Sequence, residues 1–176
     1  MDFSKIDKEM ALAIIKSAED YLAGQVSIAT SADQRAAVMA SVFAAAGAAL
    51  VAGTITISTG NFAIPVIIGG ALAGILFLAG AACCVRATMP AEFYLPGNKP
   101  HDWTTDCAQG RPLVECLGVQ ADHLQDRIEF NKRVIGKNAI WFRVGAWLGI
   151  IAPFVGALVW GLMTLGALTS ALRASV

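Results

Sequence analysis

The sequence predicts an all-α integral membrane protein with three transmembrane helices and two cytoplasmic amphipathic helices. Three observations lead to this fold class: long uncharged runs, the distribution of Lys and Arg around them, and helical periodicity in the charged segments. Of the 176 residues, 56% are hydrophobic and 15% are charged, whereas an average soluble domain has about 25% charged residues. A chain of this length would ordinarily form one domain. This composition indicates a membrane protein.

Residues 1–35 predict a cytoplasmic amphipathic helix, which we expect to run from about Ser4 to Ala29. Ser31 and Gln34 have the spacing of a capping box, so a new helix is expected to begin there with Ser31 as its N-cap. Charged residues alternate with hydrophobic ones in this region, which is not the pattern of a signal peptide. The apolar side chains that recur at helical spacing are Phe3, Ile6, Met10, Ala13, Ile14 and Tyr21.

Three uncharged runs, residues 36–57, 62–85 and 144–172, predict the membrane spans. Each reaches the roughly 20 residues that cross a ~30 Å hydrocarbon core. None contains Asp, Glu, Lys, Arg or His, and such a residue at the bilayer centre costs about 2.5–3.5 kcal/mol. A buried helical hairpin in a soluble protein is the alternative, but it would need more polar chain to cover it. We therefore expect a transmembrane hairpin over 36–85 with a turn at 58–61, and a third span with a short external tail over 144–176.

The basic residues predict the orientation of the chain. Four Lys or Arg residues precede the first run, none separates the first and second, eight lie between the second and third, and one, Arg173, follows the third. Lys and Arg are enriched in the cytoplasmic loops of membrane proteins. This distribution predicts a multi-pass protein of the inner (plasma) membrane, with a cytoplasmic N-terminus and a cytoplasmic loop and helix over 86–143.

Small residues four positions apart predict how the spans pack. In lipid, such residues allow helix backbones to approach closely. Two interpretations remain open: they join the spans of one chain, or they join copies of the chain. Pro153, midway along the third span, is expected to bend it. The residues expected at these interfaces are Ala40, Ala44, Ala48, Gly70, Gly74, Gly145 and Gly149.

The segment between the second and third spans predicts a loop followed by a helix. Pro and Gly punctuate residues 89–110. From Pro112 onwards, apolar residues alternate at spacings of four and three, which indicates a short heptad seam that packs on the N-terminal helix or on a copy of itself. Asn131 within this seam either fixes its register or faces solvent at its end. The seam consists of Leu117, Ala121, Leu124, Ile128, Asn131 and Ile135.

The sequence offers no pattern for an enzyme, a cofactor or a metal site. His101, Cys107, Cys116 and His123 are the only candidate metal cluster, and their spacing matches no tight zinc pattern. A formal net charge of zero gives no reason to expect nucleic-acid binding. Ion-coupled transporters usually need an ionisable group within the membrane, so the spans argue against a pump. They do not exclude a pore, because small polar groups or hydrophobic constrictions can line one.

The order of these elements resembles a family of small membrane effectors. Asp33 and Arg35 lie in the sequence Ala-Asp-Gln-Arg-Ala that leads into the first span, and a basic helix ending in Asn-Lys-Arg at 131–133 precedes the third. This arrangement resembles the small transmembrane effector domains of bacterial nucleotide-signal anti-phage systems, the Pycsar-effector and SLATT-like group. Such effectors often have an even number of spans and some carry a nucleotide-sensing domain, whereas this chain has three predicted spans and no visible sensor.

The resemblance implies a homo-oligomer that opens or perturbs the membrane in a bacterial defence or stress response. The signal would come through the cytoplasmic helices, from a small molecule or from a soluble signalling partner. The alternative hypothesis is a non-catalytic membrane anchor or adaptor, whose cytoplasmic helices dock a soluble partner.

Overall fold

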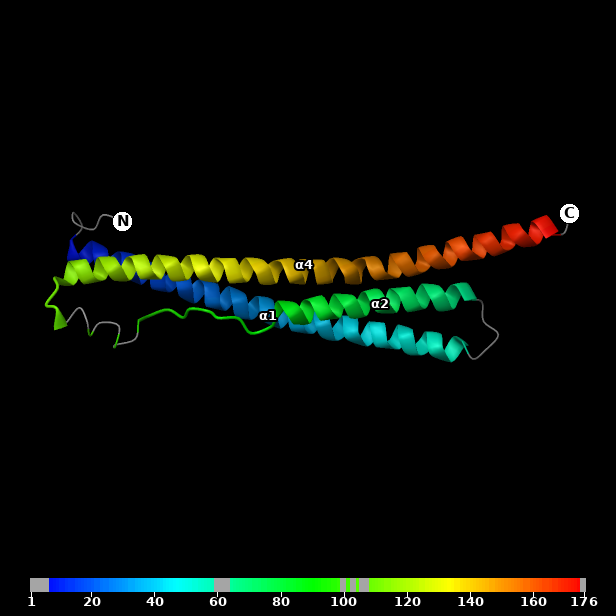
Figure 1. Ribbon diagram of the computed structural model, residues 1–176, viewed down its shortest axis with the longest axis horizontal. Helices are drawn as coiled ribbons and strands as arrows, with labels where there is room; N and C mark the ends of the chain where they lie inside the picture. The colour runs from blue at the N-terminus through cyan, green and yellow to red at the C-terminus, as the bar shows by residue number, and fades with distance from the viewer. Residues whose placement is uncertain (1–6, 59–63, 99–100, 102–103, 105–107, 175–176) are drawn as a thin grey trace. The chain divides into compact units, whose positions relative to one another are not determined.

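The chain was analysed as a computed structural model, which describes residues 7–58, 64–98, 101, 104 and 108–174. Its long elements are the helices α1 (Lys8–Ser58), α2 (Ile64–Ala87) and α4 (Leu113–Ala174), and no strand occurs in the described residues (Figure 1). All three helices are long and apolar enough to cross a membrane. The prediction of an all-helical chain with three such helices is therefore confirmed. The expected turn residues 59–61 lie outside the described part.

Helix α1 begins later than the sequence suggested, and its N-cap is a residue that the sequence analysis missed. The carboxylate Oδ1 of Asp7 accepts a hydrogen bond of 2.7 Å from the backbone N–H of Met10. The Asp7 carbonyl also accepts the N–H of Ala11 at 3.0 Å. A carboxylate that binds the third N–H of a helix is a common N-cap, and this cap fixes the start of α1 at Lys8 rather than near Ser4.

The prediction of two separate amphipathic helices was wrong. Helix α1 continues through Ser31 and Gln34 without the expected break, and α4 runs unbroken from the predicted heptad seam through Pro153. The capping box over 31–34 contains no Gly or Pro, and its residues are tolerated inside a helix, so nothing forces the chain to leave the helical conformation there. Each predicted amphipathic helix is instead one end of a longer helix.

Contacts divide the chain into two units, both built from two stretches of sequence. Unit 1 combines Met1–Ala32 with Pro90–Lys137, and unit 2 combines Asp33–Met89 with Asn138–Val176. Helices α1 and α4 each contribute their first part to unit 1 and their remainder to unit 2.

In unit 1, the beginnings of α1 and α4 bury one face each. Leu22 and Leu124 are completely buried, and Ala11 and Leu117 are nearly so. The expected apolar face of the N-terminal helix was placed incorrectly, because Met10 and Tyr21 are 55% and 58% exposed and Ala13 is also exposed. The true face is displaced by one residue, towards Ala11 and Leu22. Phe3 and Ile6 lie outside the described residues.

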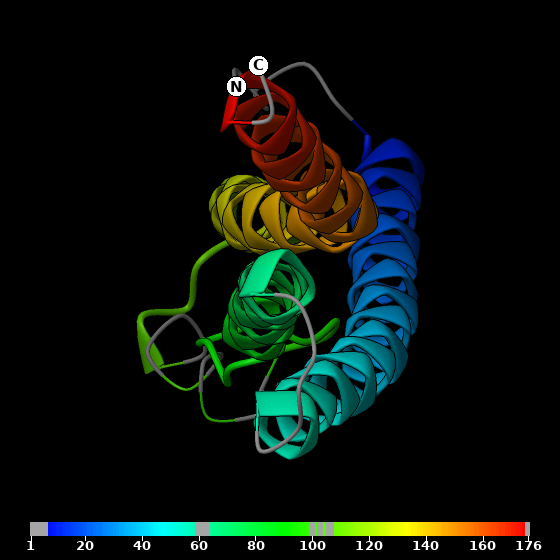
Figure 2. The same ribbon diagram turned by 90° about the vertical axis from the view of Figure 1, so that its right-hand side faces the viewer.

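In unit 2, α2 lies beside the later part of α1 and beside α4 (Figures 1 and 2). Ala40 and Phe43 of α1 form a buried cluster with Ala81 and Cys84 of α2, and Phe142 of α4 packs against it. Cys84 is entirely buried. Many of the large apolar residues of α4 point outward, including Phe154, Leu158 and Leu162, which are all more than half exposed. An apolar exterior of this kind suits a lipid environment.

Candidate functional site

Helices α2 and α4 meet at two glycine pairs in unit 2. A Cβ atom added to Gly69 would lie 2.7 Å from the carbonyl oxygen of Gly156, and one added to Gly145 would lie 2.8 Å from that of Gly80. Real Cβ atoms essentially never come this close to another heavy atom. Only glycine therefore fits at these crossings. In lipid, helices associate largely through such close van der Waals contact.

Helices α1 and α2 meet in a similar way. A Cβ atom at Gly74 would lie 2.9 Å from Cγ2 of Val51 and 3.2 Å from the carbonyl oxygen of Gly47, and one at Gly70 would lie 2.7 Å from Cγ2 of Thr54. The structure thus places Gly70 and Gly74 in contacts within one chain. An interface between copies cannot use the same glycine surfaces while these contacts persist.

The Phe43 ring connects all three helices. It packs against Phe77 of α2, with ring centroids 5.8 Å apart and planes inclined by 48°. It also occupies the space in front of Gly149 of α4, where an added Cβ would overlap the ring. Aromatic pairs at such distances and angles are favourable. The Phe43 ring therefore fills the space that a side chain at position 149 would occupy.

The predicted alanine stripe lies only partly on the buried face of α1. Ala40 is 7% exposed and belongs to the buried cluster, whereas Ala44 and Ala48 are exposed. An α-helix has 3.6 residues per turn, so a strict four-residue repeat rotates by about 40° with each step. The buried face instead continues through Phe43 and Gly47.

An apolar groove of about 410 Å³ lies among the three helices of unit 2. Gly69, Gly70 and Gly156 contribute surfaces without side chains, and Phe77 and Trp160 provide large rings. The sequence analysis did not find this groove, because it depends on which faces of three helices meet. The complete lining is Leu50, Val66, Gly69, Gly70, Ala73, Phe77, Pro153, Gly156, Ala157 and Trp160.

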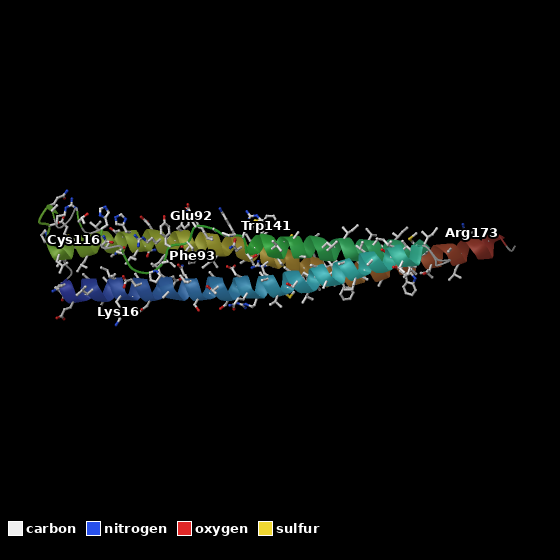
Figure 3. All side chains as sticks on the ribbon, turned by 90° about the horizontal axis from the view of Figure 1, so that it is seen from below. Lys16, Glu92, Phe93, Cys116, Trp141 and Arg173 are labelled. Carbon is white, nitrogen blue, oxygen red and sulfur yellow. The ribbon has the colours of Figure 1, made fainter. Side chains whose placement is uncertain are left out.

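Charged residues flank the apolar parts of α1, α2 and α4. The guanidinium of Arg86 lies 6.0 Å from the ring centre of Trp141, which links the end of α2 to α4. Trp141 is labelled in Figure 3. Asp33 and Arg35, which form the motif leading into the first span, are exposed on α1. A cation over an exposed Trp ring contributes about 0.5–1 kcal/mol.

An extended segment, residues 90–98, lies along α4 in unit 1, and Asn131 holds it. The side chain of Asn131 donates to the carbonyl oxygen of Tyr94 and accepts from its N–H, each over 2.9 Å. Asn131 is completely buried. The interpretation that Asn131 faces solvent was therefore wrong, and the alternative, that it fixes the register of the seam, stays a prediction.

Arg127 and Phe130 complete the attachment of this segment. The Nη1 atom of Arg127 donates to the carbonyl oxygen of Gly97 at 3.0 Å and to Oδ1 of Asn98 at 2.9 Å. The same guanidinium lies 5.7 Å from the ring centre of Tyr94, and Phe130 meets that ring edge-on at 5.2 Å. Figure 3 labels Glu92 and Phe93 on this segment; Glu92 is exposed and Phe93 is half-buried.

The remaining predicted seam residues lie on α4 in unit 1. Leu117, Ala121 and Leu124 are buried, and Ile128 and Ile135 are half-buried. Opposite them, the amide Nε2 of Gln25 donates to the carbonyl oxygen of Ile128 at 3.2 Å. The other side-chain atom of Gln25, Oε1, is buried and accepts no hydrogen bond.

The described residues of the candidate metal cluster do not come together as a metal site. His101 and His123 are exposed, and Cys116 is buried. No group of three His, Cys, Asp or Glu side chains that could hold a metal ion occurs in the described part of the chain. Cys107 lies outside it.

Comparisons of the chain with protein-family models, with curated proteins and with solved structures gave no match. The function must therefore be inferred from the arrangement described above.

Proposed function

We propose that this chain is a homo-oligomeric membrane effector that forms a pore or perturbs the bilayer in a bacterial defence or stress response. In this proposal, three helices cross the inner membrane with the N-terminus in the cytoplasm. Unit 1 lies in the cytoplasm, and unit 2 lies in the bilayer. The distribution of Lys and Arg supports this orientation.

The observation that carries the proposal is the continuity of α1 and α4. Each belongs to both units without a break. An unbroken helix transmits a rotation or a tilt along its length, whereas a flexible linker does not. A signal that changes the packing of unit 1 would therefore reach the helices of unit 2. A simple anchor would not need this connection.

The composition of the spans favours a pore or a perturbed bilayer over a pump. Residues 36–57, 62–85 and 144–172 contain no Asp, Glu, Lys, Arg or His, the side chains that ion-coupled transporters usually use within the membrane. The small polar side chains of Ser41 and Thr56 are exposed on α1. Such hydroxyl groups can line a path between assembled copies.

The outward face of α1 supports assembly. Ala44 and Ala48 are exposed, while the exposed residues of α4 include bulky ones such as Phe154 and Leu158. Small side chains allow a second helix to come close. The resemblance to the Pycsar-effector and SLATT-like group, carried by the order of the elements and the motifs around Asp33 and at residues 131–133, agrees with assembly.

The alternative function, a membrane anchor or adaptor, has its own supporting observation. Several large apolar side chains of unit 1 are exposed, among them Tyr21 and Ile28 at 58% and Leu95 at 66%. Exposed apolar groups on a unit in the aqueous phase are candidates for contact with a protein partner. In that case unit 1 would bind the partner and the spans would only hold the complex at the membrane.

The deciding experiment combines induced expression with simultaneous measurement of membrane potential and native mass. The effector proposal expects loss of potential, dye entry and a mass of several copies. An intact potential with a monomeric mass would remove it, and a co-purifying protein with an intact potential would favour the adaptor. Reporter tags at the two ends test the orientation, since an odd number of spans must place them on opposite sides.

The assembly surface has a separate test. Replacing Ala44 and Ala48 together by Leu should reduce the native mass to that of one chain, because larger side chains keep a second α1 at a distance. Replacing Leu158 and Leu162 by Ile on the exposed face of α4 is the matched control and should leave the native mass unchanged. An oligomer that survives the alanine replacements would place the interface elsewhere.

A further inference from the structure

The length and the lining of the groove in unit 2 indicate what can occupy it. The lining covers Val66 to Phe77 on α2 and Pro153 to Trp160 on α4, which correspond to lengths of about 10–16 Å at 1.5 Å per residue. The groove has a volume of about 410 Å³, is open to the surroundings of unit 2 and is lined by apolar residues.

We propose that this groove binds a single acyl chain of a membrane lipid. A hydrocarbon chain is about 4–5 Å thick, because non-bonded carbon atoms meet at about 3.5–4.0 Å, and so it fits the groove. The length also agrees, since one leaflet provides about 15 Å of the ~30 Å hydrocarbon core. The inference rests on the proposed insertion of the helices in a bilayer, but it does not require a pore.

The lining residues also indicate the leaflet. Val66 lies two residues after the start of α2, and Leu50 lies eight residues before the end of α1. The groove therefore belongs to the half of the spans next to the α1–α2 connection. Trp160 also lines the groove and is half exposed. The bound chain comes from the leaflet on that side.

Glycines create the space for the chain and keep it between helices. Gly69 and Gly156 bring α2 and α4 into backbone contact, so the floor of the groove is closed. Leu50 of α1 and Ala157 of α4 also line the groove. An acyl chain in this position contacts all three helices, and its presence or absence will affect their packing.

The test uses the full chain reconstituted in phospholipid vesicles that contain a phospholipid with a photoreactive diazirine in the middle of one acyl chain. After illumination, mass spectrometry locates the labelled residues. We expect the lining residues Ala73, Phe77 and Ala157 to be labelled about fivefold more than outward residues such as Leu162 and Leu165, which corresponds to a preference of about 1 kcal/mol. Labelling that is uniform over all exposed faces would overturn the inference.

Two variants change the groove in opposite directions. Ala157→Phe fills it and should reduce the labelling of the groove to that of the outward face, whereas Leu50→Ala widens it and should increase the labelling. Ala167→Phe, on an exposed part of α4 outside the groove, is the control and should change nothing. Retained labelling of Leu162 shows that each variant is still inserted. A groove that is labelled equally in all of these variants would contradict the proposal.

The remaining outcomes separate this inference from the proposed function. If no helix is labelled, the chain does not enter the bilayer, and the proposed function fails together with the inference. If outward residues are labelled but the groove is protected, and the native mass shows a dimer, a second copy occupies the groove instead. In that case the acyl-chain proposal alone is wrong, and the proposed assembly stands.

Discussion

Asn131 offers the sharpest test of how unit 1 is held together. Replacing it by Ala removes both 2.9 Å hydrogen bonds to the backbone of Tyr94. A hydrogen bond contributes about 0.5–1.5 kcal/mol net, and an unpaired buried group costs about 1–3 kcal/mol. Tyr94 is 43% exposed, so water can replace part of what is lost. The expected loss is therefore about 1–3 kcal/mol, confined to the extended segment 90–98.

Hydrogen exchange measured residue by residue is the suitable assay. Because every 1.4 kcal/mol corresponds to a tenfold change, the amide of Tyr94 should exchange about 10- to 100-fold faster in Asn131→Ala. Asn131→Asp is more informative: it keeps an acceptor for the Tyr94 N–H but loses the donor to its carbonyl oxygen, and it buries a charge. Gln125→Ala, at an exposed position of α4, should not affect the segment. Unchanged exchange of the Tyr94 amide in both Asn131 variants would show that Asn131 does not hold the segment 90–98.

Three further substitutions test the packing. Gln25→Leu removes a buried oxygen without a hydrogen-bond partner, a relief of about 1–3 kcal/mol, but also the Nε2 bond to the Ile128 carbonyl oxygen, a loss of about 0.5–1.5 kcal/mol, so it should stabilise unit 1 by about 1 kcal/mol in a detergent-titration experiment; a variant destabilised by more than about 1.5 kcal/mol would indicate a polar partner for this oxygen. Gly145→Leu should prevent correct packing against Gly80, with a loss of at least 1–3 kcal/mol in heat stability, while Gly161→Leu, where nothing lies within 4 Å, should be neutral. Phe43→Ala should cost about 3 kcal/mol in thermal unfolding, near the lower end for a buried Phe; a change below 1 kcal/mol would mean that the Phe43 ring is not a central contact.

The three apolar helices were predictable because their signal is local. A run of about twenty uncharged residues identifies a possible span without any knowledge of its neighbours. The prediction failed at the expected end of the N-terminal helix, where it relied on a pattern that does not stop a helix. Ser31 and Gln34 satisfy the spacing of a capping box, but spacing alone cannot break a helix when the residues around it all tolerate the helical conformation.

The faces of the helices were harder to predict than their positions. Alanines at every fourth residue look like one stripe in the sequence, but this stripe leaves the buried face after Ala40, since the repeat does not match 3.6 residues per turn. The role of Asn131 could not be predicted at all, because its partner Tyr94 is 37 residues away in the sequence. The groove likewise depends on three helices meeting, and its glycines are individually unremarkable in a chain that contains 17 of them.

The unbroken course of α1 also limits how its length can vary. One residue inserted near Ala32 would turn Phe43 by about 100° around the axis of α1 relative to Leu22, although both side chains are buried. Seven added residues would restore this angle to within about 20°. Related chains that share this helix should therefore change its length in whole pairs of turns.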